Sequence, residues 1–269
     1  MKKILVIFCM AFLATFSAGN LFAQDVKLSI PLPLTGTNAK FGEIEKRSYE
    51  IAMEEINAKG GVKGRKIVLE FEDSQGKPEV SRSIAEKLID VKKQPVIFGE
   101  YSSSCSKAVA AVAEERKTPY MVVTGATDDI TQQNYKYVFR LNPTNAYYAS
   151  GLMSFLKEVV KPTSIAVLYE SSDFGTSGAE AYSALYIIKD VLTRAKSWTP
   201  DGIRVAMKAT NTVTAFGPIK FEDKTGYTNQ NFMDTLVLQV INGQFETIWP
   251  QKYATKKYVY PIPRWRDRK

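Results

Sequence analysis

The chain has 269 residues, which is enough for one large domain or two lobes, and 45% of them are hydrophobic, ample for a core. It contains no histidine and two cysteines, which excludes the usual general base of serine and cysteine hydrolases, the commonest zinc ligand, thiolate metal clusters and a disulfide framework. We therefore expect no catalytic residues, no metal and no cofactor.

The formal net charge of +8 comes from the two ends of the chain. Lys2 and Lys3 stand at the N-terminus, and residues 251–269 hold seven basic side chains and one acidic one. The rest of the chain is formally neutral. The basic charge therefore indicates a tail over 251–269, not a nucleic-acid surface, and we expect no nucleic-acid partner. A solvated tail and a contact with anionic lipid or a partner protein both remain open.

Residues 1–23 have the pattern of a secretory signal peptide. Lys2 and Lys3 precede an apolar run over 4–16, which is too short to span a bilayer comfortably, and Ala23 offers a small residue at a cleavage point. The alternative is a buried helix or a membrane anchor. A cleaved signal predicts a periplasmic protein whose remaining thiol, Cys105, is a small packed residue.

Along the remaining chain, apolar strand patterns alternate with helical ones, which predicts an α/β fold with parallel strands and helices on both faces. The expected elements in chain order are strand 26–34, helix 43–61, strand 65–73, helix 78–92, strand 95–99, helix 106–117, strand 119–123, connector 135–144, helix 145–160 and strand 163–170.

Three loops follow predicted strands, at 35–42, 99–104 and 124–129, and ligands of open α/β sheets bind at such strand ends. The segment "EYSSSCS" places hydroxyls and unpaired N–H groups at a helix N-terminus, where an anion is favoured. In the third loop Gly125 permits close approach to the backbone and Thr127 adds a hydroxyl. We expect a carboxylate between these loops, with an ammonium group on nearby carbonyl and hydroxyl oxygens.

Two other interpretations of the serine cluster stay open at this point. Ser103 or Ser104 could simply cap the following helix. Ser103 or Cys105 could be a nucleophile, but helical spacing gives no reason for Lys107 to face the serine as a base. We therefore expect a protein that is not an enzyme.

Much of residues 26–250 resembles the periplasmic leucine/isoleucine/valine-binding proteins, the type I substrate-binding proteins of ABC transporters. The co-linear segments that carry this resemblance are "KLSIPLPLTGTNAKFG", "INAKGGVKGRKI", the serine cluster, "TGATDDIT", "RLNPTNAYYASGL", "IAVLYESSDFGTSGAE" and "FGPIKFEDKTG". The resemblance implies two Rossmann-like lobes that close on an amino acid about a three-strand hinge. It also implies a membrane permease as partner and, we expect, a monomer.

The resemblance also implies which residues form the binding site. The family holds the α-carboxylate and α-ammonium of its ligand with the serine cluster and the following loop, and aromatic residues of both lobes line the side-chain pocket. Carried over by position, the implied ligand-binding residues are Ser103, Ser104, Gly125, Thr127, Phe41 and Phe174. Gly125 replaces a more usual alanine, and both phenylalanines could equally be core residues.

The chain departs from the family near Glu180 and Ala181, where two segments that lie far apart in the family are directly joined. We infer an internal deletion and expect one helix across the junction, over 176–195. The implied domains are a signal peptide 1–23, a first lobe 24–142 plus 181–226, a reduced second lobe 143–180 plus 227–250, and the tail 251–269. The second lobe keeps few elements, among them a hairpin over 234–249 with an Asn242-Gly243 turn.

The resulting hypothesis is a binding protein of an ABC importer for a branched-chain or similar amino acid, with affinity impaired by the deletion. The alternatives are a ligand-sensing receptor-type domain that acts through a partner, a non-functional truncated homologue, and a hydrolase that uses Ser103.

Overall fold

The computed structural model describes residues 24–161, 176–224 and 226–261. Strands β1 (Val26–Leu32) and β2 (Ile67–Asp73) pair in parallel, with Val26 opposite Ile67. Near the end of β1, the Pro31 carbonyl accepts the N–H of Glu100 at 3.1 Å, and Glu100 directly follows β3 (Ile97–Gly99). The first three expected strands therefore lie side by side at one end of the molecule.

A six-stranded sheet continues from β3 in the order β3-β4-β5-β8-β7-β6. Its further strands are β4 (Tyr120–Val122), β5 (Val138–Arg140), β6 (Asn211–Thr214), β7 (Gly217–Lys224) and β8 (Tyr227–Asn231). Strands β3, β4, β5 and β8 are parallel neighbours, whereas β7 and β6 are antiparallel. The expected parallel sheet is confirmed, but 135–144 is not merely a connector, because it contains β5. All three β5 residues are buried, so this short strand shows no alternating pattern.

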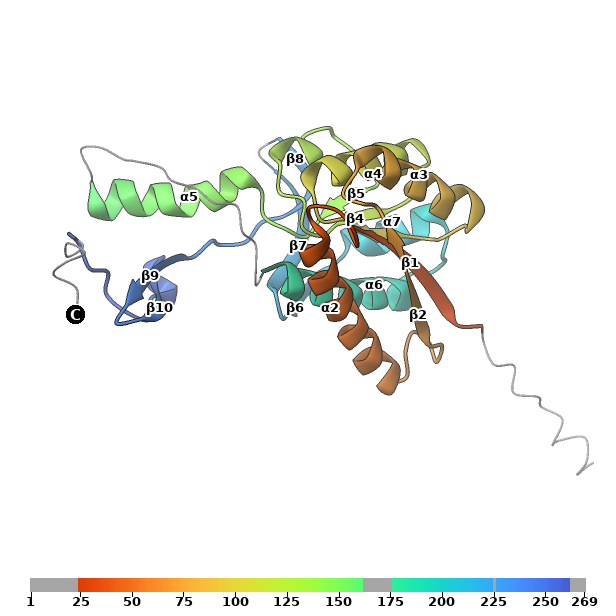
Figure 1. Ribbon diagram of the computed structural model, residues 1–269, viewed down its shortest axis with the longest axis horizontal. Coiled ribbons are helices and arrows are strands. Elements are labelled where there is room, and N and C mark those ends of the chain that lie inside the picture. The colour runs from red at the N-terminus through yellow and green to blue at the C-terminus, as the bar shows by residue number, and fades with distance from the viewer. Residues whose placement is uncertain (1–23, 162–175, 225, 262–269) are drawn as a thin grey trace, which may run out of the picture.

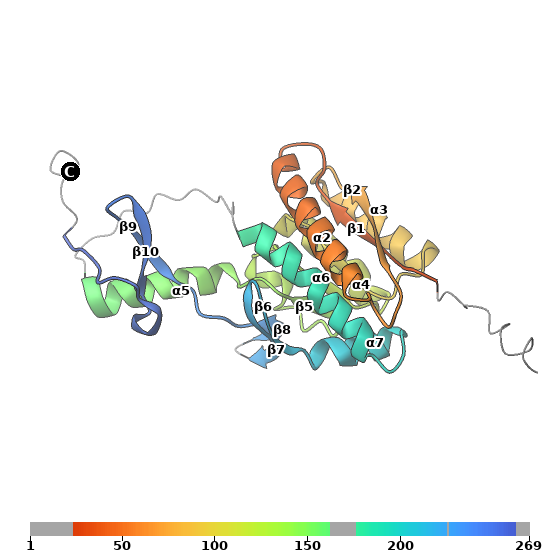
Figure 2. The ribbon, with the colours of Figure 1, turned by 90° about the horizontal axis from the view of Figure 1, so that it is seen from below.

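Two helical layers cover the strands (Figure 1). Helices α3 (Pro78–Glu86, continued by the π turn Lys87–Val91) and α4 (Ser103–Glu115) lie on one face. Helices α2 (Ala39–Ala58), α6 (Thr176–Arg194) and α7 (Pro200–Lys208) supply the other core cluster. Figure 2, viewed from below, shows α2 and α6 side by side.

Helix α2 begins at Ala39, four residues before the predicted start at Glu43. The reason is Gly42, since a Cβ on this residue would lie 2.2 Å from the Pro33 carbonyl oxygen. Without a side chain at this position, the first turn packs directly on the loop that follows β1. Phe41 is thereby placed on the helix, next to the strand ends, rather than in a loop.

A smaller unit lies beside the α/β body in Figures 1 and 2. It consists of α5 (Asn145–Phe155, continued by the π turn Leu156–Val160) and the hairpin of β9 (Val237–Ile241) and β10 (Gln244–Trp249). Asn242 and Gly243 both have positive φ, of 52° and 75°, which confirms the predicted hairpin turn. The Phe155 ring contacts the Trp249 ring, with centroids 6.1 Å apart.

The helix expected over 176–195 is confirmed as α6. Its first turns lie against α2, since a Cβ on Gly178 would be 3.1 Å from Ser48 Oγ. Strand β8, which follows residue 226, pairs with β5 and β7 in the main sheet. The division into lobes at 142, 180 and 226 stays a prediction. In the structure, residues 177–180 and β8 both belong to the α/β body.

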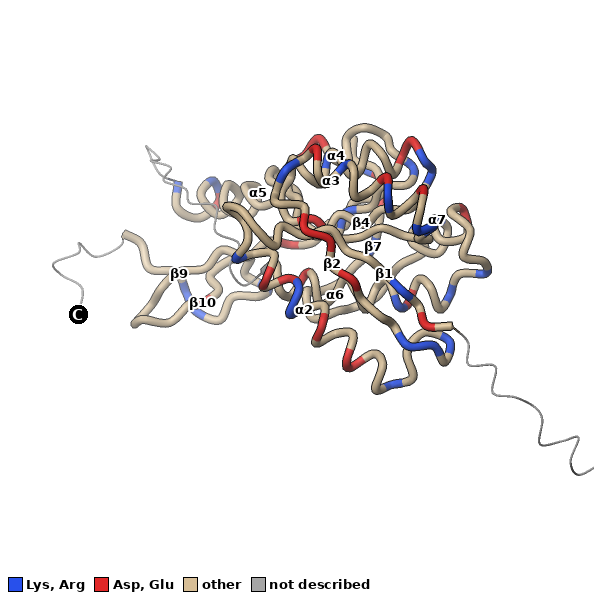
Figure 3. The backbone as a smooth tube through the Cα atoms, turned by 45° about the vertical axis from the view of Figure 1, so that its right-hand side comes forward, with Lys and Arg blue, Asp and Glu red and all other residues tan. Residues whose placement is uncertain are grey.

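Residues 1–23, the expected strand 163–170 and Phe174 lie outside the described residues. Within the described ranges, none of the helices is long and apolar enough to cross a membrane. Lys and Arg alternate with Asp and Glu over the body in Figure 3, consistent with its formal neutrality. Of the tail, residues up to 261 are described, and Thr255 N–H donates to the Thr247 carbonyl of the hairpin at 2.8 Å.

Candidate functional site

The serine cluster opens α4, but its capping residue is Ser102. Ser102 is extended (φ −82°, ψ 148°) and its Oγ accepts the Cys105 N–H at 3.3 Å. Ser103 and Ser104 are the first two residues of the helix, so the alternative that one of them is the cap is wrong. Their N–H groups belong to the first turn, which has no intrahelical acceptors for them. Because Ser102 is the cap, the Ser103 hydroxyl is not needed to cap the helix.

Ser103 joins two of the three predicted loops. Its Oγ accepts the N–H groups of Ala126 and Thr127, each at 3.2 Å. A hydroxyl oxygen has two lone pairs, so these two bonds leave the O–H hydrogen to be donated elsewhere. Ser104, by contrast, is exposed, with its Oγ 3.3 Å from Ser102 Oγ. The structure thus brings Ser103 and Thr127 together and leaves Ser104 at the rim.

Gly125 is buried against the first turns of α4. A Cβ there would lie 2.7 Å from Ser106 Oγ and 2.9 Å from Ser106 Cβ. Its contacts explain why this chain has glycine where the resembled family more often has alanine. The close approach keeps the 124–127 loop next to Ser103.

We expect Gly125→Ala to destabilise the protein by about 1–3 kcal/mol, because the added methyl group overlaps a buried side chain. Chemical denaturation followed by circular dichroism measures this change. Addition of Ser106→Gly removes the overlapping atoms and should recover part of the loss. Equal stability of Gly125→Ala and the wild type would contradict this packing.

Phe41 stacks on Tyr101, with ring centroids 4.5 Å apart and planes inclined by 6°. Both rings are half-buried at the strand ends. Tyr101 was not among the predicted residues, although its place directly before the three serines could have indicated it. The role of Phe41 as a pocket wall stays a prediction, and Phe174 lies outside the described residues.

The contacts around Ser103 do not support nucleophilic catalysis. Lys107 Nζ pairs with Asp129 Oδ2 at 2.5 Å, and this ion pair lowers the pKa of the Asp129 carboxyl. Asp129 also accepts the Thr127 hydroxyl at 3.0 Å. Cys105 is fully buried and burial raises the pKa of its thiol, which confirms it as a packed residue. Among the described residues, the hydrogen-bond partners of Ser103 Oγ are backbone N–H groups, not a side-chain base.

Two buried carboxyl groups lie beneath the strand ends. Glu100 follows β3 with φ 62°, and its carboxylate accepts Ser81 Oγ at 2.8 Å and the Tyr101 N–H at 3.2 Å. Glu45, on α2, is wholly buried, and neither of its carboxylate oxygens has a hydrogen-bond partner among the described residues. Burial raises the pKa of both groups, that of Glu45 well above its ordinary value.

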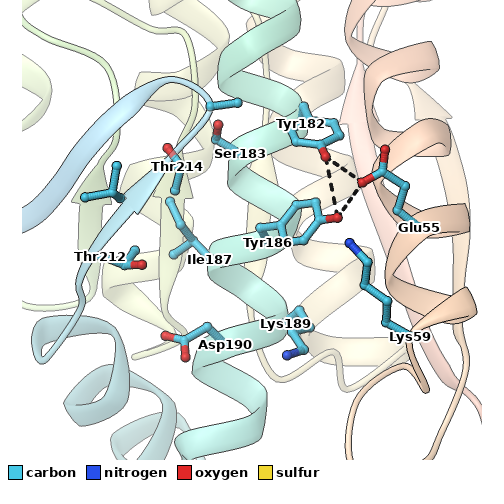
Figure 4. A pocket seen from close by; sticks show the side chains of 12 residues that line it. Glu55, Lys59, Tyr182, Ser183, Tyr186, Ile187, Lys189, Asp190, Thr212 and Thr214 are labelled. Carbon is cyan, nitrogen blue, oxygen red and sulfur yellow. Dashed lines mark hydrogen bonds between the residues drawn. The ribbon is translucent and has the colours of Figure 1, made fainter.

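A cavity of about 480 Å³ lies elsewhere, between α2, α6 and the turn that joins β6 to β7 (Figure 4). The hydroxyls of Tyr182 and Tyr186 both donate to Glu55 Oε2 at 2.6 Å, and they lower the pKa of that carboxyl. Ser183 Oγ accepts the Phe216 N–H at 3.0 Å. These groups connect neighbouring elements of the fold, and none of the predicted site residues lines this cavity.

Residues 25–184 match the family model described as periplasmic binding protein. The chain belongs to this family. Its members are binding proteins, not enzymes, as expected. The Leu/Ile/Val-binding protein homolog 7 of Brucella abortus is 36% identical over 166 residues, which are 59% of this chain and 41% of the relative. Homolog 8 of the same species is 34% identical over 163 residues. The chain thus spans about two fifths of the length of these curated relatives.

Solved structures confirm the type I periplasmic-binding-protein fold. The branched-chain amino acid binding protein LivJ of Streptococcus pneumoniae, in complex with isoleucine, gives a TM-score of 0.67 at 12% identity, covering 82% of this chain and 98% of that one. A solute-binding protein of Rhodopseudomonas palustris in complex with 4-hydroxybenzoate gives 0.63 at 14% identity, covering 82% and 95%. At these identities the likeness concerns the fold alone.

Proposed function

We propose that this protein binds the carboxylate and ammonium groups of a branched-chain or similar amino acid, as the substrate-binding protein of an ABC importer. The observation that carries the proposal is the position of Ser103, whose hydroxyl bridges to the N–H groups of Ala126 and Thr127. These groups lie at the carboxyl ends of parallel strands, where α/β proteins bind ligands.

The expected contacts of the carboxylate follow from the donors at this position. The Ser103 O–H and the free N–H groups of the first turn of α4 all donate, and the helix dipole favours negative charge. When the ligand binds, the N–H groups of Ala126 and Thr127, which donate to Ser103 Oγ in the free protein, also donate to the ligand carboxylate. Thr127 Oγ1 and loop carbonyls are acceptors for the ammonium group.

The ligand side chain would lie toward the stacked rings of Phe41 and Tyr101. Solved relatives of this fold bind isoleucine in one case and 4-hydroxybenzoate in another, and both ligands carry a carboxylate. A branched aliphatic amino acid fits the resemblance to Leu/Ile/Val-binding proteins best. The described residues support the proposed carboxylate more than they support any particular side chain.

Export and transport complete the proposal. Residues 1–23 direct the chain to the periplasm, and a membrane permease receives the ligand from the monomeric protein. Because of the internal deletion that we infer near Glu180 and Ala181, we expect weaker binding than in a protein with two full lobes. The described part of the smaller unit consists of α5 and one hairpin, and a two-stranded hairpin alone is marginally stable.

Calorimetric titration of the purified protein with leucine, isoleucine and valine tests this proposal. We expect saturable binding, and at least tenfold weaker binding of leucinamide, which keeps the side chain and amine but lacks the carboxylate. A thermal melt checks that the protein is folded. A cooperatively melting protein that binds none of the three amino acids would refute the proposed function.

A further inference from the structure

Arg140, the last residue of β5, is completely buried behind the loop that holds Ala126 and Thr127. Its Nε donates to Gln230 Oε1 at 2.6 Å and its Nη2 to Thr131 Oγ1 at 2.6 Å. Its Nη1 donates to the carbonyl oxygens of Gly125 at 3.4 Å and Thr127 at 2.5 Å. All four acceptors are neutral.

A buried guanidinium group without a directly bonded carboxylate is costly, so its place needs a reason. Burial lowers the pKa of Arg140 to about 10, and the nearby carboxylates of Asp128 and Asp129 act in the opposite direction. The side chain therefore stays protonated at neutral pH. Its positive charge lies against the back of the loop that is proposed to bind a carboxylate.

The planar peptide bond links these rear contacts to the front of the loop. In a trans peptide unit the C=O and the following N–H point in opposite directions. The Gly125 carbonyl and the Ala126 N–H belong to one such unit. When Arg140 holds the carbonyl on the rear side, the N–H is directed to the front, where it meets Ser103 Oγ at 3.2 Å.

The next peptide unit is held in the same way. The N–H of Asn145, the first residue of α5, donates to the Ala126 carbonyl at 2.8 Å. The Thr127 N–H of that unit therefore also points forward, to Ser103 Oγ at 3.2 Å. Two successive N–H groups thus face the same oxygen because two donors hold the carbonyls behind them.

We propose that Arg140, together with the Asn145 N–H, is a positioning group that aims the Ala126 and Thr127 N–H groups at the carboxylate of the ligand. A charged donor on a carbonyl also polarises the amide and strengthens its N–H as a donor. The part of the inference that concerns the ligand rests on the proposed function. The orientation of the two N–H groups is a property of the free protein and can be tested without ligand.

Arg140→Lys is the first test, because lysine keeps the positive charge but lacks the planar guanidinium group. A single ammonium group cannot bond to two carbonyls and two side chains in the way that the guanidinium does. Arg47→Lys, on the exposed face of α2, is the matched control. We expect the Ala126 amide to exchange hydrogen at least about tenfold faster in Arg140→Lys, as measured by NMR, with a smaller change at Thr127, because the Asn145 N–H still holds the Ala126 carbonyl. Rates in β3 and β4 should be unchanged. Unchanged exchange at Ala126 in the folded variant would overturn the proposal.

Asn145→Pro is the second test, and it decides the matter if Arg140→Lys does not fold. Proline is tolerated at the first position of a helix, and Thr144 before it is already extended (φ −79°, ψ 160°). The change removes the N–H that holds the Ala126 carbonyl, together with an exposed asparagine side chain. Faster exchange at Thr127 supports the proposal, and unchanged exchange refutes it.

Titration with leucine then separates this inference from the proposed function. If the wild type binds leucine, we expect about tenfold weaker binding in each folded variant, with a much smaller change for leucinamide. Equal loss for both ligands would mean a general structural effect and would contradict positioning. If the wild type binds no amino acid, the proposed function fails, while the exchange rates still decide whether Arg140 positions the two amides.

Discussion

Ser103→Ala is expected to weaken leucine binding by about 10- to 100-fold. A hydrogen bond to a charged group contributes about 1.5–3 kcal/mol, and about 1.4 kcal/mol corresponds to a factor of ten in affinity. The substitution removes the O–H donor and also the oxygen that holds the N–H groups of Ala126 and Thr127. Calorimetric titration of wild type and variant measures the change.

The stability of Ser103→Ala should change by less than about 1 kcal/mol. Ser102, not Ser103, caps α4, and the two N–H groups lie in a half-buried place where water replaces the lost acceptor. Ser83→Ala, an exposed serine on α3, is the matched control and should leave affinity unchanged. Equal leucine affinity of Ser103→Ala and the wild type would show that the ligand does not bind at this hydroxyl.

Glu45→Gln is expected to make the protein more stable than the wild type at neutral and alkaline pH, but not at pH 4. Glu45 is wholly buried, and burial raises the pKa of its carboxyl well above the ordinary value of 4.5, while the nearby Thr124 hydroxyl lowers it and Glu100 raises it further. A raised folded-state pKa means that the protonated form is favoured in the folded protein. Its contribution to stability is complete below about pH 4.5 and is lost as the pH rises toward the folded-state pKa.

That loss amounts to about 1.4 kcal/mol for each pH unit within the window, and glutamine, which does not ionise, avoids it. We expect urea unfolding at pH 4, 6 and 8 to show similar free energies at pH 4 and an advantage of at least about 1 kcal/mol for the variant at pH 8. Glu54→Gln, an exposed change on the same helix, should show no such divergence. Parallel pH profiles of Glu45→Gln and wild type would contradict a neutral buried Glu45.

The strands and helices that were predicted correctly from the sequence are those with a clear pattern of apolar residues and clear boundaries. The run 26–34 is largely apolar, the run 65–73 has an apolar centre flanked by charged residues, and Asn242-Gly243 has the residues that a two-residue hairpin turn requires. Strand β5 was missed because three buried residues carry no period. The early start of α2 was missed because it depends on the contact of Gly42 with Pro33. A packing contact of this kind does not show in the helix propensities of the local sequence.

The candidate site, like the fold, could be predicted from the sequence only in part. The serine cluster and the Gly125–Thr127 loop were indicated by residue types at strand ends, and the structure brings Ser103 and Thr127 together. Which serine caps the helix, and which faces the loop, depends on the exact start of α4. Arg140 was not identified, although a charged residue within the apolar segment "VFRL" was a signal for a buried polar network. Its partner Gln230 lies 90 residues away in the sequence.

An NMR titration of the amide-labelled protein with leucine tests the central claim most directly, because it reports where the ligand binds. We expect saturable shifts of the amides of Ser103, Ser104, Ala126 and Thr127, and little change around the cavity of Glu55 and Tyr186. Saturable binding with shifts confined to that cavity, or no shift at the serine cluster in a folded protein, would contradict binding at these strand ends.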